Sequence, residues 1–153
     1  MLGSSIAVHY VQPIGNATIA KPFREGSDRA VAVTCTTKIS GLQLASVLDG
    51  NEVIVACRAS GGTGHIMDDS EVWAAQARLA REEGIFCEPA AAVALAAALT
   101  AAKLGEVKNT SPLVCIVTGS GFKDTASVAR MTATASCPVV DLEKYIAFCS
   151  GAV

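Results

Sequence analysis

The sequence predicts an α/β fold in which helices cover both faces of a mostly parallel sheet, giving three layers. Short apolar runs alternate along the chain with longer segments of helix-forming residues, an order typical of parallel sheets with crossover helices. Hydrophobic residues make up 51% of the chain but aromatic residues only 5%, and the surplus of alanine and valine suits helices that pack closely on a sheet. A chain of 153 residues has the length of one domain and is long enough to bury a core, so we expect residues 1–153 to form a single domain.

The first 64 residues are predicted to hold one strand and two helices. β-Branched and aromatic side chains favour a strand over 6–11, and proline and glycine follow it directly. A helix near residue 50 is indicated by an N-cap residue, Asp49 or Asn51, and by apolar residues at helical spacing. The expected elements are a strand over 6–11, a helix over 17–24, an extended stretch over 30–34 and a helix ending near Ser60.

The pattern is clearer after residue 64. Residues 65–67 are typical of a strand, and Asp68 then supplies an N-cap for a helix that stops at Gly84. A second helix is predicted to begin at Pro89, because proline has no N–H to leave unsatisfied in a first turn, and to end at Gly105.

A candidate site follows the last apolar run. Residues 113–117 are continuously apolar, which favours a strand buried on both faces of a parallel sheet, and Thr118 and Gly119 come directly after it. Ligands in open α/β sheets collect at the carboxyl ends of strands, where a hydroxyl among glycines can hydrogen-bond a planar heterocycle. The alternative is that Thr118 only closes a turn. Helices predicted over 124–131 and 141–148 complete the covering layer.

Two glycine-containing stretches are weaker candidates. Residues 61–64 could cradle a phosphate through backbone N–H groups, but phosphate loops run from strand into helix, so a helix end and turn is the simpler interpretation. Residues 15–17 have the better order, strand then helix, but three residues are a weak signal and a plain turn is the favoured interpretation. His9 and His65 are expected to be strand residues rather than catalytic bases.

Charge and cysteine content narrow the partners and the compartment. The net charge is -2, from 12 basic and 14 acidic residues with no block of like charge, which argues against nucleic acid or a membrane surface and favours a small ligand. The six cysteines stand singly, so we expect no zinc site but reduced, mostly buried thiols in the cytoplasm. No signal peptide is expected, and residues 90–102 are shorter than the ~20 that a membrane span needs.

Four segments carry an ordered set of motifs. They are VQPIGNAT at 11–18, ASGGTGHIMDDSEV at 59–72, AREEGIFCEPAAA at 80–92 and VTGSGFKD at 117–124. In order and spacing they resemble the V-Q-x-x-G-A-x-P, E-S-G-G-x-x-x-x-V-T-D-E-E-I, A-R-E-E-G-I-F-C-E-P-A-S-A-A and L-T-G-H-G-L-K-D patterns of the threonine synthases. These are pyridoxal-phosphate (PLP) enzymes of the tryptophan synthase β-like group. The resemblance covers about residues 5–125 and concerns the C-terminal portion of such an enzyme.

The resemblance implies a fold type II PLP domain and a small amino-acid substrate. Threonine synthases use PLP to remove phosphate from O-phosphohomoserine and then add water at the β carbon. In this group the residue matching Thr118 presents its hydroxyl to the pyridine nitrogen of the cofactor, a neutral contact where other PLP folds use a carboxylate. Gly119 and Glu88 carry over as further residues of the cofactor site.

Departures from the family pattern leave alternatives open. The family's cofactor lysine lies upstream in an S-F-K-D-R motif, whereas Lys123 aligns with the C-terminal loop, so we expect the chain alone to lack a cofactor-binding lysine and to be inactive. Residues 33–44 replace a segment that usually contains G-N-P-x-x-W, which keeps a dehydratase or a sulfur-amino-acid synthase of the same fold as alternatives. A further alternative is a non-catalytic domain. Self-association, as a homodimer, is expected to bury apolar surface left uncovered.

Overall fold

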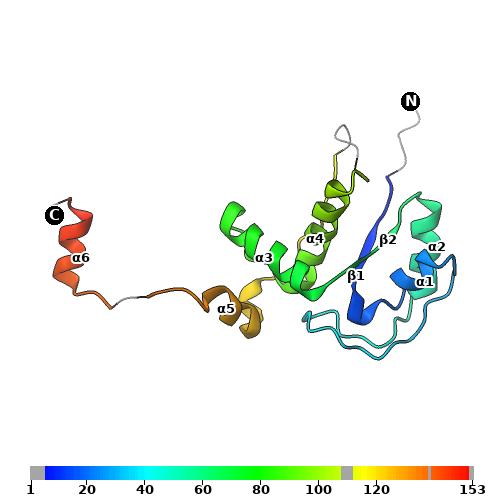
Figure 1. Cartoon of the computed structure of the whole chain (residues 1–153), viewed down its shortest axis with the longest axis horizontal. Helices are drawn as coiled ribbons and strands as arrows, with labels where there is room; N and C mark the ends of the chain where they lie inside the picture. Colours follow the sequence, from blue (N-terminus) through cyan, green and yellow to red (C-terminus); the bar gives the residue numbers. More distant parts are fainter. Residues whose placement is uncertain (1–5, 108–111, 138, 152–153) are drawn as a thin grey trace.

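The computed structural model describes residues 6–107, 112–137 and 139–151, and in this part of the chain the sheet has two parallel strands (Figure 1). β1 (Tyr10–Pro13) pairs with β2 (Gly64–Met67), so that Tyr10 lies opposite Gly64 and Pro13 opposite Met67. Parallel strands need a crossover connection. Here it contains the 3-10 helix η1 (Ile14–Asn16), α1 (Ala20–Arg24) and α2 (Gly50–Ala59).

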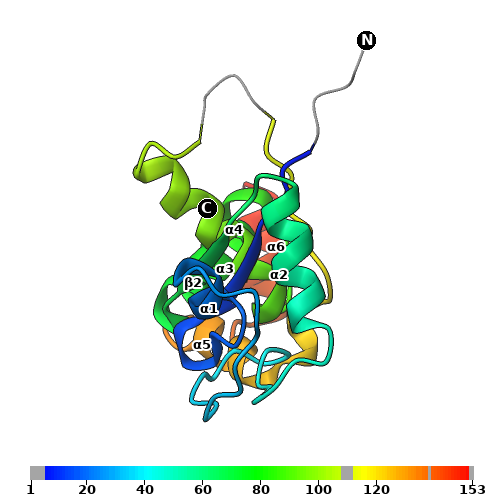
Figure 2. The ribbon, with the colours of Figure 1, turned by 90° about the vertical axis from the view of Figure 1, so that its right-hand side faces the viewer.

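Helices lie on both sides of these two strands. Successive side chains of a strand point to opposite faces. Tyr10 packs against the core beside α1 and α2, whereas Val11 packs against the core beside α3 (Asp69–Glu83) and α4 (Pro89–Lys103). Figure 2, seen from the side of α2, places α3 and α4 behind the strands. The α/β prediction and the parallel pairing are therefore confirmed, with a smaller sheet than expected.

Each side has its own hydrophobic core. On the α1 and α2 side, Ile19, Phe23, Ile54 and Cys57 pack together, and Tyr10 meets the edge of the Phe23 ring at 5.8 Å between centroids. Burying a side chain such as Ile54 stabilises the fold by about 1.5–3 kcal/mol. On the other side the contact between α3 and α4 is made largely by small alanine side chains, which allow the two helices to approach closely. The buried residues of this second core are Ile39, Met67, Val72, Ala75, Cys87, Ala91, Ala92, Val93, Ala96 and Ala97.

The ends of α3 and α4 follow from local chemistry that the sequence displays. The backbone N–H of Asp68 donates to the Glu71 carboxylate at 3.0 Å, half of a capping box. Gly84 adopts a left-handed conformation with φ +70 and ends α3. Pro89 is the first residue of α4, as predicted. The helices expected near residues 50–60, 68–84 and 89–105 are confirmed.

The first strand is shorter than the apolar pattern predicts. It runs over Tyr10–Pro13 rather than over 6–11, because it pairs with β2 over Gly64–Met67, and Pro13, which was expected to follow the strand, is its last residue. Residues 30–34 form no strand. The N–H of Val31 donates to the Thr18 carbonyl and that of Val33 to the Ala45 carbonyl, both at 2.9 Å, so these groups bind loop carbonyls instead of a ladder.

The predicted buried strand over 113–117 is wrong. These residues belong to no strand, and Val114 and Ile116 are 87% and 75% exposed. A strand buried on both faces needs neighbours that pair with its backbone and helices that cover its faces. The described part of the chain supplies neither, so an apolar run that has the composition of a core strand lies on the surface.

The C-terminal helices form where predicted but pack differently. α5 (Thr125–Thr132) follows the 3-10 helix η2 (Gly121–Lys123) and buries Ser127. α6 (Leu142–Cys149) buries no residue, and Figure 1 shows it set apart from the other helices. Its exposed apolar residues include Ile146 and Phe148. The expectation that both helices complete the covering layer is wrong for α6.

The cysteines are less buried than expected. All six are free thiols, but only Cys57 and Cys87 are buried, while Cys137 and Cys149 are exposed. Apolar character alone does not place a cysteine in the core. Cys137 and Cys149 are exposed because their segments pack against little of the rest of the described chain. Among the described residues no helix combines the length and the apolar character needed to cross a membrane.

Candidate functional site

The loop after residue 117 lies against the segment that leads into α4. Cys87 and Ser120 form an antiparallel bridge. The N–H of Glu88 donates to the Gly119 carbonyl at 3.3 Å, and the N–H of Gly121 donates to the Phe86 carbonyl at 2.9 Å. Two motifs that lie thirty residues apart in sequence are thereby brought into contact, and the residues named from the resemblance, Thr118, Gly119 and Glu88, lie together.

Both glycines of this loop are required by its geometry. Gly119 has φ +52, and a Cβ built there would collide with the Glu88 carboxyl group. A Cβ on Gly121 would lie 2.7 Å from the Cys87 carbonyl oxygen and 2.7 Å from the Phe86 ring. The loop therefore approaches the Phe86–Glu88 segment more closely than any side chain at either position would allow.

The polar centre of the loop is the Glu88 carboxylate. One oxygen accepts a hydrogen bond from the Thr118 hydroxyl at 2.9 Å, and the other lies 3.0 Å from the Lys123 ammonium. The hydrogen bonds from Lys123 and then from Thr118 lower the pKa of Glu88. The Glu88 side chain is 25% exposed and that of Lys123 65% exposed, so solvent screens the ion pair and its net contribution to stability is small.

A buried polar network hydrogen-bonds the Cys87 backbone. The Gln76 side chain, 2% exposed, donates through Nε2 to the Cys87 carbonyl at 2.8 Å. Its Oε1 lies 3.2 Å from the Ser127 hydroxyl, which in turn accepts from Arg130 at 2.7 Å. Sequence reasoning missed this network, because Gln76 and Ser127 lie on helices, 51 residues apart, and no local pattern marks either one.

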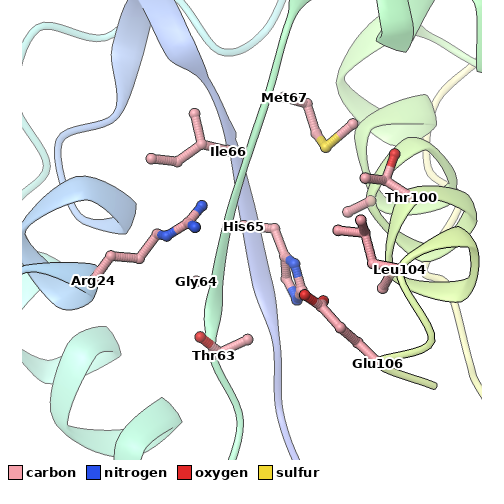
Figure 3. A pocket seen from close by; sticks show the side chains of 11 residues that line it. Arg24, Thr63, Gly64, His65, Ile66, Met67, Thr100, Leu104 and Glu106 are labelled. Atoms are coloured by element: carbon pink, nitrogen blue, oxygen red, sulfur yellow. The ribbon is translucent and has the colours of Figure 1, made fainter. Parts of the chain in front are cut away.

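A hollow of the described surface lies elsewhere. A cavity of about 150 Å3 is bounded by β2 and the C-terminal half of α4, with His65, Thr100 and Glu106 among its lining residues. Figure 3 shows the Glu106 carboxylate close to the His65 ring, while Arg24 lies on the other side of β2. The cavity lies toward the opposite end of α4 from Glu88, and Ala97, the first α4 residue of its lining, is about 14 Å from Glu88 along the helix axis. It is therefore not part of the Thr118 site.

The two histidines make a contact that the sequence did not predict. His9 Nδ1 and His65 Nε2 are 3.0 Å apart, and the rings stack with centroids 5.3 Å apart. Burial, followed by the neighbouring His9, lowers the pKa of His65. Only His65 is a strand residue, since His9 directly precedes β1.

The glycine stretch at 61–64 acts as a helix end. Gly61 has φ +78, and the N–H of Gly62 donates to the Cys57 carbonyl at 3.1 Å, closing the last turn of α2. A Cβ on Gly62 would collide with the Val8 carbonyl. The interpretation as a C-cap and turn is confirmed, because the N–H of Gly62 is directed at a protein carbonyl rather than at a ligand.

The chain matches a known enzyme family over most of its length. The pyridoxal-phosphate dependent enzyme family matches residues 1–119, and the chain belongs to it. Among curated relatives, the threonine synthase of Methanosarcina acetivorans is 33% identical over 122 residues, 77% of this chain and 29% of that protein. The threonine synthase of Methanocaldococcus jannaschii is 30% identical over 121 residues, 78% of this chain and 30% of that protein. The chain thus spans less than a third of the length of these relatives.

A solved structure is similar in fold over nearly the whole chain. A lysine-to-alanine mutant of O-ureido-L-serine synthase with bound O-ureido-L-serine aligns with 95% of this chain and 39% of its own, with a TM-score of 0.58 and 20% identity. At this level of identity the likeness concerns the fold alone. It places the two strands and their helices in the same architecture as a larger enzyme.

One edge of a PLP ring could bind at this loop. The Thr118 side chain is exposed, and Gly119 beside it adds no side chain that would screen the hydroxyl from a planar ligand. Thr118, Gly119 and Glu88 could therefore hold the ring-nitrogen edge. Lys123, the lysine of this motif, is engaged with Glu88, so contacts to the phosphate and aldehyde groups would come from other residues.

Proposed function

We propose that this chain supplies the ring-nitrogen side of a PLP site in a threonine synthase-like lyase. The reaction would convert O-phosphohomoserine to threonine and phosphate. The observation that carries the proposal is the contact of the Thr118–Gly119 loop with Glu88, which joins two segments of the family's motif set. The curated relatives reported above, both threonine synthases, support the choice of substrate.

The chain's own residues would orient the cofactor rather than transfer protons to the substrate. PLP, when bound, withdraws electrons from the carbon next to the amino group of its substrate. Thr118 would fix the rotation of the ring in its plane through one hydrogen bond at the nitrogen. Gly119 would let the ring approach the loop, and the Phe86 and Phe122 rings, in edge contact at 5.0 Å, would hold the loop in place.

A chimera tests this proposal. Residues 6–124 would replace the corresponding segment of the Methanosarcina acetivorans threonine synthase, which supplies the rest of the enzyme. We expect phosphate and threonine to form from O-phosphohomoserine in equal amounts. A folded chimera that binds PLP but deaminates threonine or serine, without releasing phosphate, would instead favour a dehydratase.

The second candidate function is a non-catalytic domain that pairs with itself. The observation that favours it is the exposed apolar run over 113–117 together with the exposed apolar residues of α6. Contiguous apolar surface of this kind is unusual on a monomer. Light scattering of the 153-residue chain measures this pairing, and the chimera decides between the two functions: a chain that forms a dimer, together with a folded chimera that binds no PLP, would support the second function.

A further inference from the structure

The two histidines of the chain face each other where the chain enters β1. His9 directly precedes β1, and His65 is the second residue of β2. Their facing atoms, His9 Nδ1 and His65 Nε2, are 3.0 Å apart, well below the 5.3 Å between the ring centroids, so both nitrogens lie between the rings. At this distance one ring donates its N–H to the lone pair of the other.

The number of protons on this pair decides whether the contact can exist. A neutral imidazole carries one proton on its two nitrogens, and a charged imidazolium carries one on each. When both rings are neutral, or when the pair has gained one proton, a single hydrogen lies between the facing nitrogens and the hydrogen bond holds. A second added proton puts an N–H on both facing nitrogens of two charged rings. His9 and His65 cannot then remain 3.0 Å apart.

The groups that act on His65 come from several elements. Burial, followed by His9, lowers its pKa, and Arg24 of α1 lowers it further, whereas Glu106, which follows α4, raises it. Figure 3 shows the Glu106 carboxylate close to the His65 ring and Arg24 on the other side of β2. The balance leaves the pKa of His65 below the ordinary histidine value of 6.5. The doubly charged pair is therefore reached only in mild acid.

The segment that carries His9 is also held by neighbours that do not change charge in mild acid. The N–H of Tyr10 donates to the Thr63 carbonyl at 3.3 Å, which is longer than usual, and the Cys57 thiol donates to the Val8 carbonyl at 3.0 Å. Burial raises the pKa of Cys57 and raises that of Tyr10 to about 12, so both groups stay neutral. Between pH 5 and 8, the histidine pair is thus the part of this contact that titrates.

We propose that His9 and His65 form a pH-operated latch, which holds the segment entering β1 against β2 at neutral pH and releases it when both rings are charged. The latch lies at the amino ends of the two parallel strands, so it depends on neither PLP nor the proposed function. The folded state binds the second proton less readily than the unfolded chain does. The latch therefore stabilises the fold above the ordinary histidine pKa, and this stabilisation is lost as the pH falls through the lower, folded pKa.

Hydrogen exchange of the Tyr10 amide in the 153-residue chain tests the latch. The measured quantity is the protection factor, the intrinsic exchange rate divided by the observed one, which removes the direct effect of pH on exchange. We expect it to fall about tenfold between about pH 7.5 and about pH 5, the factor that one unit of pKa carries. The amide of Val72, in the core of α3, is the internal control and should keep its protection.

Variants of the pair separate hydrogen bonding from charge. His9→Asn is the matched control, because its side-chain amide can donate to His65 or accept from it and never becomes charged; Tyr10 should stay protected over the whole pH range. His9→Ala lacks the partner and should show low protection at every pH. Glu106→Gln should move the opening to lower pH and Arg24→Met to higher pH, since the first removes a group that favours charged His65 and the second removes one that opposes it.

The histidine ring signals in NMR report on this pair alone, because the sequence contains two histidines. We expect two coupled titration steps, the second below the ordinary histidine pKa. The inference is wrong if the two rings titrate independently at the ordinary value, or if the protection of Tyr10 depends on pH in His9→Asn as it does in the unchanged chain. An equal loss of protection at Val72 would also contradict it, because acid would then unfold the protein as a whole.

Discussion

Gly119→Ala is the substitution that most directly probes how closely the loop approaches Glu88. Two effects add. The left-handed conformation, φ +52, disfavours any residue with a Cβ by about 1–2 kcal/mol. The new methyl group would also collide with the Glu88 carboxyl group, which must move and give up its contacts with Thr118 and Lys123. Those contacts are partly exposed, so their loss adds only about 1–2 kcal/mol in total.

The matched control is Gly84→Ala. Gly84 also has a left-handed conformation, φ +70, but nothing lies within 4 Å of the position of its Cβ. Gly84→Ala should therefore lower the free energy of unfolding only through the cost of the left-handed conformation, about 1–2 kcal/mol, against about 2–4 kcal/mol for Gly119→Ala. Urea unfolding of the two variants and the unchanged chain measures the difference. Equal losses at the two positions would refute the argument, because the carboxyl group would then not lie against the loop.

Three further predictions concern the ion pair, the buried network and the exposed apolar run. The pKa of Glu88 is lowered in the folded protein, so its ion pair stabilises the fold at pH values above the pKa of an unfolded glutamate. This stabilisation is lost as the pH falls through the lower pKa of the folded state. The difference in free energy of unfolding between the unchanged chain and Glu88→Gln, measured against pH, should therefore disappear in acid. Gln76→Leu should cost about 1–3 kcal/mol in urea unfolding, since it leaves the buried Cys87 carbonyl without its donor; a loss below ~0.5 kcal/mol would contradict this, as such small changes are typical of surface positions. Val114→Lys should reduce self-association in light scattering, whereas Leu48→Lys, at a position that is also exposed but lies outside the apolar run, should not. Equal effects would argue against pairing through this run.

The parts of the fold that could be predicted are those whose signals are local. Asp68, Gly84 and Pro89 mark helix ends through the chemistry of a few neighbouring residues, and the helices begin and end where those residues stand. The strand expected over 113–117 depended on neighbours that periodicity cannot reveal. A run of apolar residues shows that a segment can be buried, but the segment becomes a core strand only where other strands pair with it.

The candidate site likewise has residues that the sequence indicated and residues that it did not. Thr118, Gly119 and Glu88 were indicated by resemblance to a motif set, and they lie together. The ion pair of Lys123 with Glu88 was not predicted, because sequence reasoning considered Lys123 only as a cofactor lysine. Gln76 was missed altogether, since a buried glutamine on an amphipathic helix has no distinguishing local pattern.

The most direct measurement of the central claim is the effect of Thr118→Val on the chimera that contains residues 6–124. If Thr118 contacts the ring nitrogen, the substitution removes one hydrogen bond at nearly constant volume, at a cost of about 1–3 kcal/mol in cofactor binding or in the transition state. Cofactor affinity or turnover should then fall about 5- to 150-fold, and Ser120→Ala in the same loop should have a smaller effect. A folded Thr118→Val chimera whose absorbance spectrum, cofactor affinity and rate all equal those of the unchanged chimera would mean that this hydroxyl does not lie at the ring.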